Sequence, residues 1–338
     1  MTPAALAAAV PACTLAEARK LVAMVHRGEP VRASSAVRCV AADAVRAAGD
    51  VPTLTIKETA ASAIDPFVKY ALAGADGRVF ETVRIPLEIA GRWSVCVSSQ
   101  VGCALACAFC ATGRMGLARN LEAWEIVEQI RIVRAQLPHG RVHGVVFQGM
   151  GEPLANLDAV LQAIAVLSDP CAQGVDARAI TVCTSGLPQG IRRLAREAPK
   201  VRLGISFGSA RPAVRRSLMP IDRAHSLDEV LDAAAEHARL TGLAPMWAVT
   251  LLDGVNDSDD DARALAERVR AFHAATGQRP RLSIIPFNSL GADDPFQRAP
   301  LERERAFRGV LADAGLPSHK RYSGGGDVAA ACGQLAAR

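Results

Sequence analysis

The chain has 338 residues, half of them hydrophobic, and carries a formal net charge of +5. This length and apolar content support a large core, in one large domain or two ordinary ones. No apolar run reaches the roughly 18 residues of a membrane span, and the start of the chain lacks the basic region of a signal peptide, so we expect a cytoplasmic protein without a membrane partner.

The nine cysteines are an odd number in a chain without a secretion signal. A disulfide framework is therefore not expected, and metal binding or catalysis explains this cysteine content better. The mildly basic charge is compatible with a nucleic-acid partner without being diagnostic of one. Aromatic residues make up only 4% of the chain, which argues against a surface that stacks many bases.

The first part of the chain divides into two segments of different pattern. Residues 1–64 are rich in alanine and show helical patterning, which predicts a small helical N-terminal segment. Residues 65–98 alternate in short β-like runs around the turn signal Asp76-Gly77, which predicts a β-rich extension leading into the core.

From Leu121 onward, helical patterns alternate with short apolar runs. Helices are expected near residues 121–136, 157–167, 190–197, 227–241, 259–274 and 301–314. The apolar runs between them read "VHGVVFQG", "AITVCTS", "VRLGISF", "PMWAVTLL" and "RLSIIPF". This alternation predicts parallel strands joined by right-handed crossovers, and hence an α/β fold with a partial (βα)6 barrel over residues 99–338. The site of such a fold lies at the carboxyl ends of its strands.

Three cysteines stand in the stretch "GCALACAFCATGRMG" with the spacing C-x3-C-x2-C: Cys103, Cys107 and Cys110. A four-iron, four-sulfur cluster is normally held by four thiolates, so three would leave one iron open for another ligand. Zinc is the alternative, but it requires a fourth Cys or His, and the loop contains no His. Inert buried thiols are the third interpretation, and such tight clustering is unusual for them.

The C-x3-C-x2-C spacing is the signature of radical S-adenosylmethionine (SAM) enzymes, and other strings resemble one family of them. The strings "VFQGMGEPLANLDAV", "TVCTSGL", "LLDGVND", "IPFN" and "GDVAAACGQL" look like the RlmN/Cfr family of adenine-C2 methyltransferases of 23S rRNA and tRNA. The resemblance covers about residues 65–338 in order. It implies a radical SAM barrel, one [4Fe–4S] cluster on the three cysteines, and SAM on the open iron.

The resemblance also assigns residues to the SAM site: Gly151, Glu152, Cys183, Ser206, Gly208 and Asn288. A carboxylate such as Glu152 suits the cationic amino group of methionine, although a capped turn into the next helix would also explain it. The chain departs from the family at two of these positions. Cys183 stands where the family usually has Ser, and Gly208 stands where it usually has His.

Three further residues match the catalytic groups of the family. Cys332 matches the cysteine that carries the methyl group, and Cys96 matches its partner, which releases the product and leaves a transient disulfide. Glu81 matches the general base that removes the C2 proton. The implied mechanism uses two SAM molecules, one to methylate Cys332 and one to generate a 5′-deoxyadenosyl radical.

These assignments predict a radical SAM RNA methyltransferase that acts on C2 of an adenine in rRNA, tRNA or both. The first alternative keeps the mechanism but uses another RNA position or a substrate other than RNA. The second is a non-catalytic iron–sulfur protein that binds RNA. Expected partners are RNA and a reducing protein such as flavodoxin or ferredoxin, and the enzyme is expected to be a monomer.

Several basic residues could form a positively charged rim around the barrel mouth, although for each residue taken singly ordinary solvated helix charge is the favoured interpretation. They are Arg114, Arg119, Arg131, Arg192, Arg193, Arg215, Arg216, Lys320 and Arg321.

Overall fold

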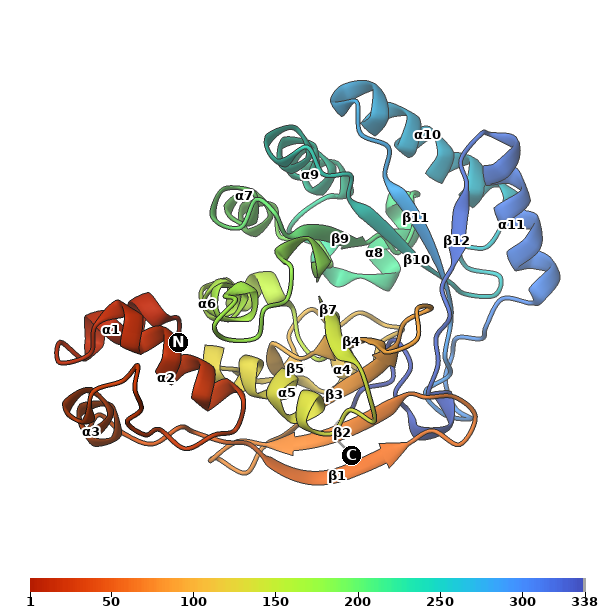
Figure 1. Cartoon of the computed structure of the whole chain (residues 1–338). Helices are drawn as coiled ribbons and strands as arrows, with labels where there is room; N and C mark the ends of the chain where they lie inside the picture. Colours follow the sequence, from red (N-terminus) through yellow and green to blue (C-terminus); the bar gives the residue numbers. More distant parts are fainter. Residues whose placement is uncertain (337–338) are drawn as a thin grey trace.

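A single ten-stranded sheet organises the computed structural model, which describes residues 1–336 (Figure 1). The strands follow one another in the order β1-β2-β3-β4-β7-β8-β9-β10-β11-β12. Their bounds are Thr55–Ala61 (β1), Val68–Ala73 (β2), Val79–Pro86 (β3), Arg92–Val97 (β4), Arg141–Phe147 (β7), Ile180–Thr184 (β8), Arg202–Ser206 (β9), Met246–Leu251 (β10), Arg281–Pro286 (β11) and Ser318–Lys320 (β12). A separate hairpin pairs β5 (Gln100–Cys103) with β6 (Gly116–Asn120).

Within the ten-stranded sheet, the strands β4, β7, β8, β9, β10, β11 and β12 run parallel, and helices on the outer side of the sheet join successive ones (Figure 1). These helices are α5 (Ala123–Ala135), α6 (Leu157–Ser168), α7 (Pro188–Glu197), α9 (Leu227–Thr241), α10 (Asp259–Thr276) and α11 (Leu301–Asp313). The short helix α8 (Pro212–Leu218) lies instead at the carboxyl ends of the strands, where its Arg215 side chain donates to the carbonyls of Ser185 and Ser206. The predicted α/β fold with six βα units is confirmed, with β12 as a short seventh parallel strand that the apolar pattern did not reveal.

Local sequence signals explain where the longest helices begin and end. In α10 the side chain of Ser258 accepts from the N–H of Asp261, and Gly277 ends the helix with a φ of +71°. In α9, Ser226 and Gly242 do the same. Hydroxyl N-caps and left-handed glycines at the C-terminus satisfy the free backbone groups that every helix end leaves.

The N-terminal part contains three helices, α1 (Pro3–Ala9), α2 (Leu15–His26) and α3 (Cys39–Ala47). The structure then places β1 inside the segment that was predicted to be helical. β1 pairs with β2 over its whole length, so the helical segment ends before Thr55. β4 in turn pairs with β7 and is therefore the first strand of the barrel, although the β-rich extension was predicted to reach residue 98.

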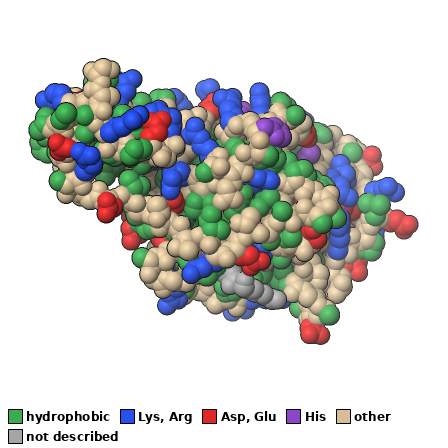
Figure 2. All heavy atoms as spheres, turned by 60° about the horizontal axis from the view of Figure 1, so that its bottom comes forward, with side chains coloured by type: hydrophobic (Ala, Val, Ile, Leu, Met, Phe, Trp, Pro, Cys, Tyr) green, Lys and Arg blue, Asp and Glu red, His purple; other side chains and the backbone are tan. Residues whose placement is uncertain are grey.

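The sheet extension and the N-terminal helices form one face of the molecule (Figure 2). Lys and Arg side chains on this face alternate with Asp and Glu side chains rather than gathering in one continuous patch (Figure 2). No helix in residues 1–336 is long and apolar enough to cross a bilayer.

The last part of the chain crosses from β12 to the opposite end of the sheet. Asp65, between β1 and β2, accepts hydrogen bonds from the Tyr322 hydroxyl and from the N–H of Gly325, both at 2.9 Å. Asp327 accepts from the hydroxyl of Ser62 at 2.8 Å. The C-terminal segment (residues 321–336) therefore spans the gap between the two ends of the curved sheet, where no strands pair.

Candidate active site

The cysteine loop begins at the hairpin of β5 and β6. Gly102 has a φ of +79°, and a Cβ atom there would lie 1.9 Å from the carbonyl oxygen of Gly116, so only glycine lets the two strands approach. Cys103 ends β5, and Cys110 is the N-cap residue of the short helix α4 (Ala111–Arg114). Between them, Ala106 has a φ of +51°, a rare conformation for a residue with a side chain.

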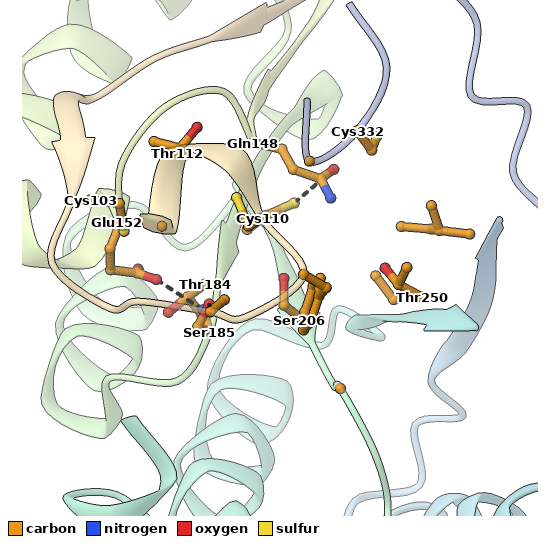
Figure 3. A pocket seen from close by; sticks show the side chains of 18 of the residues that line it. Cys103, Cys110, Thr112, Gln148, Glu152, Thr184, Ser185, Ser206, Thr250 and Cys332 are labelled. Atoms are coloured by element: carbon orange, nitrogen blue, oxygen red, sulfur yellow. Dashed lines mark hydrogen bonds between the residues drawn. The ribbon is translucent and has the colours of Figure 1, made fainter. Parts of the chain in front are cut away.

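All three cysteines line one cavity at the carboxyl ends of the parallel strands. It contains about 950 Å³ of space, including the part open to solvent. The predicted SAM residues that line it are Gly151, Glu152, Cys183, Ser206 and Gly208. Figure 3 shows Glu152 close to Thr184 and Ser185, and Gln148 close to Cys332. The structure thus brings together residues from the loops after β5, β7, β8 and β9, as the barrel geometry predicts.

Glu152 is a buried carboxylate in the cavity wall. Its two oxygens accept from the backbone N–H groups of Leu154 at 3.0 Å and Ser185 at 2.9 Å. Burial raises the pKa of this carboxyl group, and the N–H donors oppose that shift. No Lys, Arg or His among residues 1–336 pairs with it. A buried carboxylate without a protein cation fits the ammonium group of SAM. It also caps the turn Pro153–Asn156, as the alternative interpretation expects, and its contact with SAM stays a prediction.

Arg215, on α8, holds the strand ends that form the cavity floor. It is fully buried and pairs with Asp222 at 3.1 Å. Its guanidinium donates to the carbonyl oxygens of Ser185 at 2.7 Å and Ser206 at 3.1 Å. Arg215 fits neither of the two interpretations weighed for it, a rim residue or a solvated helix charge, because its charge is satisfied inside the protein.

Gly208 explains one departure from the family pattern. Its φ is +67°, and a Cβ atom there would lie 2.5 Å from the sulfur of Met219. Its carbonyl accepts from the side chain of Asn256 at 2.8 Å. A glycine at this position therefore suits the backbone of this chain, and no side chain enters the cavity from it.

Asn288 does not line the cavity with the other predicted SAM residues. Its side-chain amide donates to the hydroxyl of Ser323 at 2.9 Å and to the carbonyl of Cys332 at 3.0 Å. Ser323 also accepts from the N–H of Cys332 at 3.2 Å. In the structure, Asn288 therefore holds the backbone of Cys332 rather than facing the cofactor cavity.

Cys332 lies where two cavities meet. It lines the cavity that contains the three loop cysteines, and it also lines a second cavity with Cys96 and Arg321. Gln148 lines both as well. The predicted pair of Cys96 and Cys332 is thus brought together by β4 and the C-terminal segment. The implied disulfide is not supported, because all nine cysteines are free thiols in the described structure.

Glu81, on β3, lines neither cavity. It is buried, and its carboxylate pairs with Lys69 at 3.0 Å. The same carboxylate accepts from the N–H of Ala336 at 2.8 Å. Glu81 therefore anchors the end of the described chain to the sheet, and its role as a general base stays a prediction.

The chemistry of the three loop cysteines fits an iron–sulfur cluster. Burial raises the pKa of Cys103 to about 11 and that of Cys107 to about 12, and it also raises the pKa of Cys110. Buried thiols become thiolates when a metal supplies the positive charge. Within residues 1–336, no three His, Cys, Asp or Glu side chains converge to hold one metal ion.

The predicted basic rim is not observed as a set of free charges. Eight of the nine candidates pair with carboxylates: Arg114 with Asp294, Arg119 with Asp76 and Glu125, Arg131 with Glu128, Arg192 with Glu236, Arg193 with Asp158 and Glu197, Arg215 and Arg216 with Asp222, and Lys320 with Glu304. Arg321 differs, because it faces the second cavity and its ionisable neighbours are thiols.

Sequence reasoning missed the roles of Gln148, Arg215 and Arg321. Gln148 lies inside the motif "VFQGMGEP" and directly follows β7. Polar residues at the carboxyl ends of parallel strands are candidates for the site, and this signal could have identified Gln148. Arg321 follows a strand of only three residues, which is too short to show a pattern. Arg215 lies on a seven-residue helix whose buried face no periodicity reveals.

Comparison with known proteins agrees with this site. Residues 97–269 match the model of the radical SAM superfamily. The chain is 60% identical to the "Probable RNA methyltransferase" of Sorangium cellulosum, over 95% of this chain and 88% of that protein. It is 42% identical to the dual-specificity RNA methyltransferase RlmN of Syntrophobacter fumaroxidans, over 80% of this chain and 76% of that protein.

A solved structure extends the agreement to the whole fold. A radical SAM methyltransferase from Sphaerobacter thermophilus superposes with a TM-score of 0.89 at 34% identity, covering 100% of this chain and 98% of that one. Superfamily membership implies a [4Fe–4S] cluster and SAM as cofactors, and the cavity residues fit both. The chain therefore belongs to the radical SAM superfamily and, within it, to the RlmN-type family of RNA methyltransferases.

Proposed function

We propose that the protein methylates C2 of an adenine in rRNA, tRNA or both, with Cys332 as the carrier of the methyl group. The observation that carries this proposal is the position of Cys332 at the junction of two cavities. A methyl carrier has to face the cofactor that loads it and the partner thiol that frees it. Cys332 borders both.

The cofactors set what the protein residues have to do. When bound, the cluster and SAM supply the methyl group and a 5′-deoxyadenosyl radical. Cys103, Cys107 and Cys110 would hold the cluster, and Glu152 would orient SAM through its amino group. The backbone of Cys332 is held by Asn288 and Ser323, which keeps its sulfur at the cavity boundary.

Cys96 is the thiol that releases the product from Cys332. Its backbone carbonyl accepts from the Thr82 hydroxyl at 2.7 Å, which fixes the end of β4. Burial raises the pKa of Cys96 to about 12, and Arg321 acts in the opposite direction. A buried neutral thiol stays unreactive until its neighbourhood favours the thiolate, which suits a group that acts only in the last step.

RNA is the substrate class named for the related proteins, and the features of this chain are compatible with it. The net charge is positive, and basic side chains are distributed over the face of Figure 2 among acidic ones. A modest, dispersed charge provides limited phosphate binding, so the shape of a folded RNA would contribute much of the recognition. The electron donor would be a flavodoxin or ferredoxin, and the free thiols suit the reducing cytoplasm.

The test uses Cys96→Ala protein isolated from cells. If Cys96 only releases the product, this variant should accumulate covalently joined to its substrate through Cys332. A nuclease-sensitive gel shift that disappears in the Cys96→Ala, Cys332→Ala double variant would support methylation of RNA. Full product formation by Cys96→Ala would contradict the role of Cys96, and an adduct without nucleotides would favour a substrate other than RNA.

A further inference from the structure

The second cavity contains a cation that the mechanism above does not use. Arg321 follows β12, and its backbone N–H continues the pairing with β11 by donating to the carbonyl of Ile284 at 2.8 Å. The side chain reaches into the cavity lined by Cys96 and Cys332. Its backbone is therefore held by the sheet, and its guanidinium has a defined location near the two thiols.

Gln148 fixes the guanidinium on its other side. Nη1 of Arg321 donates to Oε1 of Gln148 at 2.7 Å, and the thiol of Cys183 donates to the same oxygen at 3.7 Å. Gln148 follows β7 and Cys183 belongs to β8. Arg321 and Gln148 therefore link the ends of three strands around one group of thiols.

The charges around Arg321, a half-buried arginine in the wall of the second cavity, are unusual. Burial lowers the pKa of its guanidinium, but Cys332, Cys183 and Cys96 raise it, so that the pKa lies above the usual value. No carboxylate of the described residues pairs with this arginine. A cation removed from water needs a compensating negative charge, and a thiolate is the one that these neighbours can provide.

We propose that Arg321, anchored by Gln148, is a positioning residue that stabilises the thiolate of Cys332 for methyl acceptance and then that of Cys96 for product release. The proposal rests on the methyl-carrier role proposed above. Each thiol first loses its proton to solvent, and a fixed cation favours that loss. Cys332 would then form its bond to the methyl carbon as the bond of that carbon to the sulfur of SAM breaks. Cys96 would form a bond to the sulfur of Cys332 as the bond of that sulfur to the product carbon breaks, with the electron pair going to the product. Because Arg321 borders the cavity of both thiols, one residue can serve both steps.

For Cys96 and Cys183, burial raises the pKa of the thiol and the charge of Arg321 lowers it. The ionisable groups facing Arg321 are Cys96 from β4, Cys183 from β8 and Cys332 from the C-terminal segment, and Glu152 acts on Cys183 from the far side. Burial raises the pKa of Cys183 to about 12, with Arg321 opposing this. Arg321 is the cation that acts on both Cys96 and Cys183.

The experiment measures how fast iodoacetamide alkylates Cys332 in the full-length, anaerobically reconstituted protein without SAM, followed by peptide mass spectrometry. Only protein whose Cys332 peptide has its unmodified mass is used. Arg321→Met should slow alkylation at neutral pH about tenfold or more and move the pH midpoint upward by about one unit. Arg321→Lys should recover much of the rate, because it retains the charge. Arg193→Met is the control, since Arg193 lies in a surface ion pair, and it should match the wild type.

Cluster absorption in each variant shows whether the loop is intact. A wild-type alkylation rate and pH profile in Arg321→Met protein with an intact cluster would overturn the proposal. If the Arg321→Met protein loses its cluster, the Gln148→Leu variant is measured instead, because it retains the cation of Arg321 but removes the side chain that anchors it. A several-fold slower alkylation of Cys332 in Gln148→Leu would support the proposal. An unchanged alkylation rate would overturn it. The assay requires neither RNA nor turnover. The assay can therefore contradict the role of Arg321 even if Cys332 is the methyl carrier, and it can support that role even if methyl transfer to Cys332 is not observed.

Discussion

The backbone N–H of Ala111 donates to the carbonyl of Gly333 at 2.8 Å. This bond joins the residue after Cys110 to the residue after Cys332. A second bond runs beside it, from the hydroxyl of Thr112 to the carbonyl of Leu335 at 2.5 Å. The cluster loop and the C-terminal segment are therefore fastened together, so a change in one is expected to displace the other.

Thr112→Val tests this link. It removes a buried hydroxyl with little change in volume and leaves the carbonyl of Leu335 without its donor, which costs about 1–3 kcal/mol. We expect faster hydrogen exchange in residues 332–336 and about tenfold slower methylation of Cys332, with cluster absorption unchanged. Thr276→Val is the matched control, since its hydroxyl donates to a carbonyl at the end of α10. Equal methylation in both variants would show that the link does not position Cys332.

Replacing any one loop cysteine should remove the cluster. Cys107→Ala leaves two thiolates, which cannot hold a [4Fe–4S] cluster with one open iron. Iron per protein after anaerobic reconstitution should fall well below that of the wild type, and reductive cleavage of SAM should stop. Cys39→Ser is the control, because Cys39 is exposed on the N-terminal helices and should retain full iron content. Full iron content in Cys107→Ala would contradict the assignment.

Glu152→Gln should weaken SAM binding about tenfold to hundredfold, because it replaces a charged acceptor by a neutral one. Equilibrium binding of SAM to the reconstituted protein measures this, with Glu236→Gln on the surface of α9 as control.

The pH dependence of the same binding gives a second test. Burial raises the pKa of Glu152, so its carboxylate is lost by protonation at a higher pH than that of an ordinary glutamate. SAM affinity should therefore fall as the pH is lowered, and Glu152→Gln should remove this part of the dependence. If the pH dependence of SAM binding were identical in the wild type and in Glu152→Gln, the titrating group would be a residue other than Glu152.

Arg215→Met should destabilise the protein strongly. The substitution leaves Asp222 with only the longer, exposed pair to Arg216 and leaves the carbonyls of Ser185 and Ser206 without donors. Breaking one side of a buried ion pair costs about 3–5 kcal/mol. Thermal unfolding should show a clearly lower Tm, whereas Arg193→Met on the surface should change it little. Similar Tm values for the two variants would contradict the structural role of Arg215.

Glu81→Gln separates anchoring from proton transfer. A glutamine can still accept from the N–H of Ala336, but it cannot act as a general base. If Glu81 is the base, the variant should still methylate Cys332 yet stop at the adduct with RNA. If Glu81 only anchors the chain, product should form at near the wild-type rate. Mass spectrometry of the Cys332 peptide and of the RNA distinguishes the two outcomes.

Much of the barrel could be predicted from the sequence, because its signals are local. The alternation of helical and apolar runs correctly placed α5, α6, α7, α9, α10 and α11, as well as the five longest strands of the parallel sheet after β4. The C-x3-C-x2-C spacing predicted the cluster loop for the same reason, since eight residues of chain hold three sulfurs near each other. β1 escaped prediction because its strand conformation comes from pairing with β2, not from its own pattern.

The group of Cys96, Gln148, Cys183, Arg321 and Cys332 was decided by the tertiary structure alone. Its members come from β4, the end of β7, β8, the end of β12 and the C-terminal segment. Their separation along the chain exceeds any helical or strand period, so no pattern relates them. The sequence by itself determined the fold class, and it predicted the cluster ligands and the methyl-carrying cysteine. Only the curvature of the sheet and the crossing of its C-terminal segment placed a half-buried cation beside the thiols, because the environment of a charge depends on every element packed around it.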